Sequence, residues 1–332
     1  MPAEQDRIKA MTFDRPEYIP VGVGILPATW MRHREQLDAL VRRHPAVFGS
    51  APPGPRDYDA VGGTYAAGEH VDEWGCVWSN VRSGMEAIVT GHPVPRREMV
   101  RSFRPPQRLT GRHPHGFMFL RLFDLRGFEE MMVDFAEEPP ELQMLIDLVL
   151  GHNLRNLQLR LKEERGPIIY FGDDNGMQTS LPISPAKWRK YIKPAYAKLY
   201  GRCREAGLHV YMHTDGCVWE VVGDLIDCGV EVLNLQYRAN GLDNLVRTCK
   251  GKVCLNLDLD RQMFPFATPG QIDAHVRQCV EALGSPEGGL WLSAECGPDV
   301  PLENIEAICA ALEKYRGFFR GGQPGSPGRA SA

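Results

Sequence analysis

Short apolar runs alternate with longer amphipathic stretches from about residue 165 to the end of the chain. The runs are continuously apolar rather than apolar at every second position, which is typical of strands covered on both faces of a parallel sheet. Each run is followed by a stretch with helical periodicity. Five strand–helix units follow one another, starting at PIIYFGDD, LHVYMHTDG, VEVLNLQ, VCLNLDLD and GLWLSAEC. The pattern predicts an α/β fold, either a barrel or a doubly wound open sheet.

The first half of the chain is less regular. EYIPVGVGIL and HGFMFLRLF predict two further strands, and residues 127–163 predict helices that break at EEPPE. Residues 50–95 are rich in Gly, Pro and Tyr, which indicates irregular structure with short hairpin strands. The end, GGQPGSPGRASA, has no core-forming residues, so residues 321–332 are predicted to be a disordered tail behind a single domain of residues 1–320.

The choice between barrel and open sheet depends on nucleotide-binding fingerprints. No GxGxxG follows a predicted strand, and GxxxxGK[ST] does not occur. This absence weakens the dinucleotide-binding open sheet. It favours a TIM (β/α)8 barrel of eight parallel strands, with residues 50–95 as an irregular N-terminal extension over the barrel mouth.

Composition and charge restrict the class of protein further. The 332 residues are 43% apolar with a formal net charge of -4, which argues against a general nucleic-acid or anionic-membrane binder. No apolar segment approaches the roughly 18 residues of a membrane span, and the charged N-terminus does not resemble a secretory signal. Nine cysteines are scattered without a CxxC pair. Together these features predict a cytoplasmic protein from a reducing compartment.

The candidate chemistry gathers at the ends of the late strands. In a parallel barrel these carboxyl ends form the mouth in which active sites are built. We expect Asp174 and Asp258 to act as catalytic groups beside His213. Polar side chains around them are expected to bind the substrate, namely Asp173, Gln178, Asn234 and Gln236. The neighbouring Asp260 and Glu295 add to the polar mouth.

His213 and Asp215 are two positions apart on an extended segment, so their side chains point to the same side. Cys296 ends a strand three units later and could reach the same mouth. Imidazole, carboxylate and thiolate form a plausible zinc site with an open fourth position. Without a metal, His213 could be a general base or a hydrogen-bond donor, Asp215 could cap the helix near Cys217, and Cys296 could be a buried thiol.

One further candidate lies in the irregular region. In EHVDEWGCVW, Asp72 and Trp74 could line the rim of the pocket and contact the substrate. A Trp-Gly turn flanked by solvated carboxylates is the alternative.

Several segments, in order along nearly the whole chain, carry a family resemblance: DEWGCVW, LRGFEEMMVDFAEEPP, FGDDNGMQTSLPISPAKWRKYIKP, HTDG, LDRQMFPFATPGQI and PLENIEA. They resemble the uroporphyrinogen decarboxylase superfamily, on the side of its cobalamin-dependent methyltransferases. The resemblance implies a TIM barrel. It also implies transfer of a methyl group between a small O-, N- or S-methyl substrate and a corrinoid.

Members that act on thiols bind zinc through a His-x-Cys motif and a later Cys, which the resemblance maps onto His213, Asp215 and Cys296. Asp215 stands where that motif has cysteine, so O-methyl or N-methyl substrates are the nearer class. DAHVRQ is only the beginning of a cobalt-ligating DxHxxG signature. The corrinoid is therefore expected on a partner protein, and the chain itself could form a homodimer.

Two alternatives remain open. A decarboxylase of tetrapyrrole acids needs several arginine anchors for the substrate's carboxylates. In WMRHREQLDAL Arg32 is in place, but Arg34 comes too soon to be the second anchor. A non-catalytic accessory protein that binds a metal or a corrinoid is the other alternative.

Overall fold

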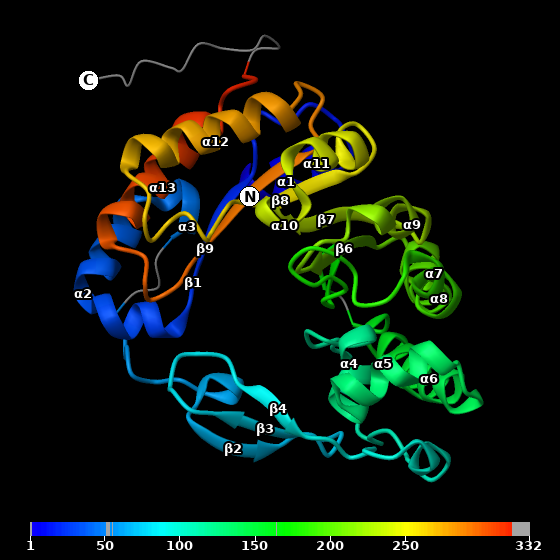
Figure 1. Ribbon diagram of the computed structural model, residues 1–332. Helices are drawn as coiled ribbons and strands as arrows, with labels where there is room; N and C mark the ends of the chain where they lie inside the picture. Colours follow the sequence, from blue (N-terminus) through cyan, green and yellow to red (C-terminus); the bar gives the residue numbers. More distant parts are fainter. Residues whose placement is uncertain (1, 51–53, 55, 164, 321–332) are drawn as a thin grey trace, which may run out of the picture. The chain divides into compact units, whose positions relative to one another are not determined.

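The computed structural model of the chain describes residues 2–50, 54, 56–163 and 165–320 (Figure 1). The chain divides into two compact units. The first contains residues 1–67, 80–86 and 235–332, and the second contains residues 68–79 and 87–234. The expected single domain of residues 1–320 stays a prediction, and the expected disordered tail lies outside the described residues.

Parallel strands form where the sequence has its continuous apolar runs. In the first unit β1 (Val21–Ile25) pairs with β9 (Leu290–Cys296), and β9 pairs with β8 (Cys254–Asp258), both in parallel. In the second unit β5 (Ile168–Gly172) pairs in parallel with β6 (His209–Thr214). The unit boundary falls within β7 (Val230–Gln236), and the strand order is β1-β9-β8-β7-β6-β5.

The predicted α/β fold with parallel strands is confirmed. All five late strands and the strand in EYIPVGVGIL form, which gives six parallel-sheet strands among the described residues. Closure into an eight-stranded TIM barrel stays a prediction.

One predicted strand is wrong. HGFMFLRLF begins in a loop and continues as helix α4 (Phe119–Arg126). A short apolar run does not distinguish a strand from a buried helix, and here the backbone N–H groups at the helix start are bound by a carboxylate distant in sequence. The predicted break at EEPPE is confirmed, since α5 (Phe128–Glu137) ends there and α6 (Pro140–Arg160) begins.

Two helices begin at a side-chain cap. Thr268 forms a capping box with Gln271 at the start of α12 (Pro269–Leu283), which packs on α13 (Leu302–Tyr315). Ser184 caps α7 (Pro185–Tyr191). The other helices of the first unit are α1 (Pro2–Met11), α2 (Pro27–Arg43), α3 (Pro45–Phe48), α10 (Tyr237–Asn240) and α11 (Leu242–Cys249). The second unit also contains α8 (Lys193–Glu205) and α9 (Val222–Asp227), the latter preceded by the 3-10 turn Trp219–Val221.

Residues 50–95 contain the predicted short strands. β2 (Gly68–Val71), β3 (Val77–Asn80) and β4 (Ile88–Gly91) form a three-stranded sheet in that order. Short 3-10 turns lie on either side, at Gly63–Tyr65 and Arg97–Arg101. The position of this region over a barrel mouth stays a prediction.

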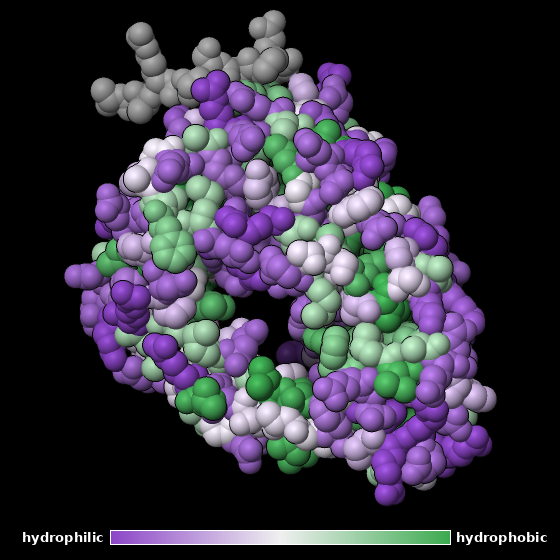
Figure 2. Space-filling view, viewed as in Figure 1, coloured by the Kyte–Doolittle hydropathy of each residue, from purple (hydrophilic) through white to green (hydrophobic). Residues whose placement is uncertain are grey.

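Each unit has an apolar core. In the first unit the core includes Leu257, Leu292, Val276, Ile308 and Leu312, none more than 1% exposed. In the second unit a stack of buried rings, including Tyr196 and Tyr200 with centroids 5.4 Å apart, packs under β5 and β6. Hydrophilic residues cover most of the face shown in Figure 2, with apolar residues in smaller patches.

Among the described residues, no helix is long and apolar enough to cross a membrane. The cytoplasmic location stays a prediction.

A histidine–carboxylate cluster as candidate active site

Strand β6 places His213 on the more accessible of its two faces. Val210, Met212 and Thr214 are buried, whereas His209, Tyr211 and His213 alternate with them and are partly accessible. His213 and Asp215 do lie together, as predicted, because His213 Nε2 is 3.5 Å from Asp215 Oδ1.

The two neighbouring carboxylates after β5 have different surroundings. Asp173 is completely buried and accepts hydrogen bonds from the backbone N–H groups of Phe119 (2.5 Å) and Leu120 (2.8 Å) at the start of α4. The Tyr196 hydroxyl donates a third hydrogen bond at 2.7 Å. Burial raises the pKa of Asp173 to about 6, although the hydrogen bonds from these donors act to lower the pKa. Asp173 therefore holds α4 in place, and its position gives no support to the predicted contact with substrate.

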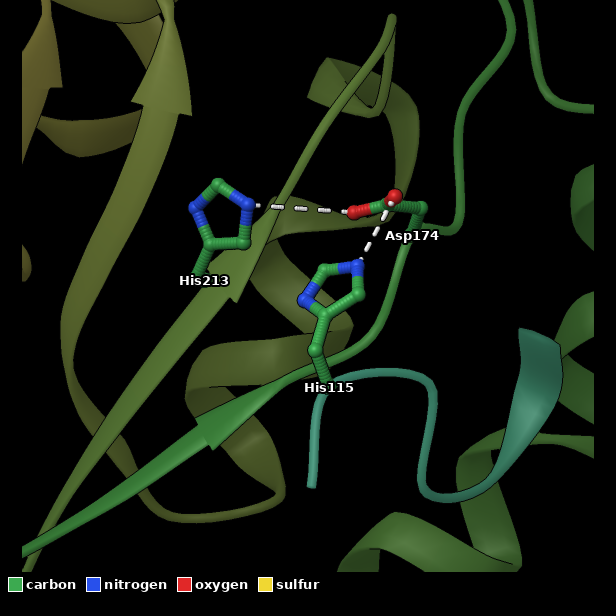
Figure 3. Close-up of side chains that lie close together, drawn as sticks. All are labelled: His115, Asp174 and His213. Atoms are coloured by element: carbon green, nitrogen blue, oxygen red, sulfur yellow. Dashed lines mark hydrogen bonds and ion pairs between the residues drawn. The ribbon is translucent and has the colours of Figure 1, made fainter. Parts of the chain in front are cut away.

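Asp174 lies at the centre of a cluster with two histidines (Figure 3). Its Oδ2 is 3.0 Å from His115 Nε2, and its Oδ1 is 3.8 Å from His213 Nε2. Oδ1 also accepts the backbone N–H of Asp215 at 3.0 Å. The predicted proximity of Asp174 and His213 is thus present, with both groups in the second unit.

The ion pair between His115 and Asp174 shifts the pKa of both groups. Partial burial alone would lower the pKa of His115, but the hydrogen bond and charge of Asp174 raise it to about 9. Burial alone would raise the pKa of Asp174, and His115 more than offsets this, so that the pKa lies below its ordinary value.

The second ring nitrogen of His213 fixes the orientation of the ring. Nδ1 lies 2.7 Å from Oδ1 of Asn234, which ends the second unit within β7. An amide oxygen accepts, so Nδ1 carries the hydrogen and Nε2 of the neutral ring presents its lone pair to Asp174 and Asp215. Asn234, predicted to bind substrate, thus acts on His213.

Two glycines let the loops after β5 and β6 meet. A Cβ atom on Gly216, whose φ is +84°, would lie 2.3 Å from the carbonyl carbon of Gly176. Backbone hydrogen bonds from Gly176 to Asp215 (3.2 Å) and from Cys217 to Met177 (2.8 Å) join the two loops. This close approach keeps Asp174 and Asp215 beside each other.

His115 was not among the site residues predicted from the sequence. It precedes α4 in the loop RHPHG, and its ring lies over the end of β5, where a Cβ on Gly172 would come within 2.7 Å of Nδ1. Only a glycine at that position leaves room for the ring. The available signal was the pair of histidines in RHPHG, of which His115 was assigned to the start of the strand predicted in HGFMFLRLF.

The remaining predicted residues of the second unit lie elsewhere. Asp72 accepts from the backbone N–H groups of Trp74 and Cys76, both at 2.9 Å, and pairs with Arg121 at 3.0 Å. Trp74 is buried and lines a small pocket that also includes Pro114 and Phe117, on either side of His115 in sequence. Gln178 is exposed in the loop after β5.

Three predicted residues end strands of the first unit, namely Gln236, Asp258 and Cys296. Asp258 and Cys296 are buried, and burial raises the pKa of the Cys296 thiol far above its ordinary value. The predicted ligand set of His213, Asp215 and Cys296 draws on both units and stays a prediction. Within the described residues, the group compact enough to hold a metal is His115, Asp174 and His213, whose ligand atoms lie within 4.8 Å of one another.

Comparison with known proteins gives a family match and a similar fold. A family model described as uroporphyrinogen decarboxylase (URO-D) matches residues 123–315, more than half of the chain. The structure is similar to that of a methyltransferase from Methanosarcina mazei, with a TM-score of 0.63 and 17% identity over 94% of this chain and 98% of that one. No curated protein sequence matches the chain.

A more distant likeness involves a dihydropteroate synthase from Xanthomonas albilineans, with a TM-score of 0.30 and 14% identity over 49% of this chain and 55% of that one. A B12-independent methionine synthase from Shewanella sp. W3-18-1 gives 0.29 and 12% identity over 52% of each chain.

Proposed function

The chain belongs to the uroporphyrinogen decarboxylase family, and from this premise we propose that it is a methyltransferase. It moves a methyl group between a small O-, N- or S-methyl substrate and a corrinoid carried on a partner protein. The observation that carries the proposal is the cluster of His115, Asp174 and His213 at the carboxyl ends of parallel strands. Full-length similarity in fold to a methyltransferase supports it.

We propose that the site also holds a metal ion, with zinc as the first candidate. The residues fit one, because the lone pair of His213 Nε2 faces carboxylate oxygens of Asp174 and Asp215 at 3.8 and 3.5 Å. A bound cation would supply positive charge beside the heteroatom that gains or loses the methyl group. Asn234 fixes the His213 tautomer, and the Gly176–Gly216 contact keeps the carboxylates at the strand ends.

The two arginines near the N-terminus do not support the decarboxylase alternative. Arg32 donates to the backbone carbonyl of Pro298, and Arg34 pairs with Asp59 at 2.7 Å. Both guanidinium groups are thus engaged within the first unit. Asp258 stays a candidate catalytic group, and a non-catalytic accessory protein stays the third alternative.

The test is methyl transfer to free cobalamin in place of the corrinoid protein. Reduced cob(I)alamin and a panel of O-, N- and S-methyl compounds are mixed with the purified protein, and formation of methylcobalamin is followed by absorbance. We expect turnover with at least one donor, and loss of at least about 100-fold in rate for His213→Ala. His209→Gln is the matched control, because His209 lies on the same face of β6 but pairs with Glu231 at 2.9 Å.

Conversion of a porphyrinogen octa-acid to a tetracarboxylate, with no methyl transfer from the panel, would replace the proposal with the decarboxylase. Absence of both reactions, together with tight binding of cobalamin, would favour the accessory protein.

A further inference from the structure

We propose that the second unit carries a complete metal site made only of nitrogen and oxygen ligands: His115, Asp174 and His213. We further propose that this site favours substrates whose methyl group is attached to oxygen. The metal site stands on the geometry of the cluster alone, whereas the substrate class rests on the proposed methyltransferase function.

The three ligands come from three different elements, and both imidazole rings direct a nitrogen at the Asp174 carboxylate (Figure 3). His115 comes from the loop before α4, Asp174 from the exit of β5 and His213 from the end of β6. Neighbouring ligand atoms of a tetrahedral zinc ion lie about 3.3 Å apart, given ligand distances of about 2.0–2.1 Å. His115 Nε2 lies 3.0 Å from Oδ2 of Asp174, His213 Nε2 lies 3.8 Å from Oδ1, and one ligand atom from each residue lies within 4.8 Å of the others. Small movements of these side chains would bring the three ligand atoms to the separation that zinc requires.

The orientation of His213 is that of a ligand. Its Nδ1–H donates to Asn234 at 2.7 Å, so in the neutral ring the Nε2 lone pair is directed at two carboxylate oxygens. With no hydrogen between them, a lone pair and an anionic oxygen repel each other. The distances of 3.5 and 3.8 Å are also too long for hydrogen bonds. A cation between these groups turns the repulsion into attraction, and the Asn234 hydrogen bond is the usual outer contact of a ligating histidine.

Asp215 completes the surroundings of the site. Its backbone N–H donates to Asp174 at 3.0 Å, and its carboxylate lies 3.5 Å from His213 Nε2. A second carboxylate on this side can accept a hydrogen bond from a water molecule at the fourth position. This role agrees with a site of three protein ligands that leaves one position open for substrate.

The ligand types decide the substrate class. One carboxylate and two neutral imidazoles leave a divalent ion with a net charge of +1, whereas one imidazole and two thiolates leave it neutral. The nitrogen–oxygen site is therefore the stronger Lewis acid and the harder one, and it favours oxygen over sulfur.

For a methyl ether or methanol, transfer would break the methyl–oxygen bond, and the reduced corrinoid of the partner would supply the electron pair of the new bond to carbon. The electron pair of the broken bond would stay on oxygen, where a cation held by His115, Asp174 and His213 would stabilise it, and water would then supply a proton.

The experiment measures metal binding directly. The protein is stripped with a chelator, then titrated with Zn²⁺ by calorimetry and with Co²⁺ by visible absorbance. We expect one ion per chain, tetrahedral d–d bands with Co²⁺, and no thiolate-to-cobalt charge-transfer band. His115→Ala, Asp174→Asn and His213→Ala should each weaken binding at least about 10-fold.

Cys296→Ala and His209→Gln should bind as the unchanged protein does. Circular dichroism and the thermal midpoint of each variant show whether it is folded, and His115→Gln replaces His115→Ala if that variant is not. A thiolate band that Cys296→Ala removes would overturn the proposed ligand set in favour of His213, Asp215 and Cys296. Absence of binding by the folded protein would remove the metal altogether.

The substrate class is tested with matched pairs that differ only in methoxy against methylthio. We expect faster methyl transfer to cob(I)alamin from the oxygen member. The reverse order would overturn the substrate assignment while leaving the metal site, and metal binding without any methyl transfer would overturn the proposed function alone.

Discussion

At the scale of single residues, the adjacent carboxylates Asp173 and Asp174 have different surroundings. They point to opposite sides of an extended segment, one into the core and one toward the histidines. Asp173 binds three donors at distances of 2.5–2.8 Å, so its loss leaves the N-terminus of α4 without an acceptor.

Asp173→Ala should therefore lower the free energy of unfolding by about 3 kcal/mol, since it leaves buried donors unsatisfied. Urea denaturation followed by circular dichroism measures the change. Asp174→Asn is the matched control at the next position, and should cost less than about 1 kcal/mol, because its side chain is 29% accessible. Equal losses in both variants would show that Asp173 has no special role in holding α4.

The sequence indicated that part of this cluster would be adjacent. His213, Asp215 and Asp174 follow apolar runs that end together at one edge of a parallel sheet, and this adjacency is a property of the fold class. The sequence did not distinguish Asp173 from Asp174, because that depends on which face of β5 is covered. It also did not show His115, which meets Asp174 across 59 positions of sequence.

At the scale of elements, the contact between the loops after β5 and β6 depends on the absence of side chains. Gly216 has a φ of +84°, and a Cβ on it would overlap the backbone of Gly176. Both a strained φ and a backbone clash would follow from any substitution.

Gly216→Ala should destabilise the protein by about 2–4 kcal/mol and weaken the histidine–carboxylate cluster with it. Gly223→Ala is the control, because Gly223 lies in α9 with nothing within 4 Å of the added Cβ. That substitution should be neutral or should stabilise the protein by about 0.5–1 kcal/mol. Thermal unfolding of both variants measures the difference, and a Gly216→Ala variant as stable as Gly223→Ala would contradict the close approach.

The elements themselves were predictable to different degrees. Strands β5 to β9 have continuous apolar runs with polar ends, so their positions were read correctly. Helix α4 was mistaken for a strand because its start is fixed by Asp173, a residue far from it in sequence. Local periodicity contains no information about such a distant cap.

At the scale of the whole molecule, all nine cysteines are buried as free thiols. Burial raises the pKa of several of them to about 12, namely Cys76, Cys203, Cys228, Cys279 and Cys309. A raised folded-state pKa means that the folded protein binds these protons more tightly than the unfolded chain. Their stabilising contribution is complete below the ordinary pKa of 9.0 and is lost as the pH rises toward 12.

The folded protein should therefore react slowly with a thiol reagent at pH 8, and all nine thiols should react after denaturation. The free energy of unfolding should fall as the pH is raised from 9 to 11. The reference is the triple variant Cys76→Ala, Cys203→Ala, Cys228→Ala, whose stability at each pH is compared with its own stability at pH 7. The decrease between pH 9 and pH 11 should be larger in the unchanged protein than in this variant. Rapid labelling of several thiols in the folded state at pH 8 would contradict this burial.

The pairing of β1 with β9 has a consequence for how the chain is synthesised. Val21 is opposite Leu292, and β1 lies at the edge of its sheet with β9 as its neighbour. During translation the N-terminal strand therefore leaves the ribosome long before its hydrogen-bonding partner exists, whereas the second unit, residues 68–79 and 87–234, is by then already complete. A nascent chain interrupted before residue 290 keeps an unpaired apolar strand, which is the kind of segment that chaperones bind and that aggregates in their absence.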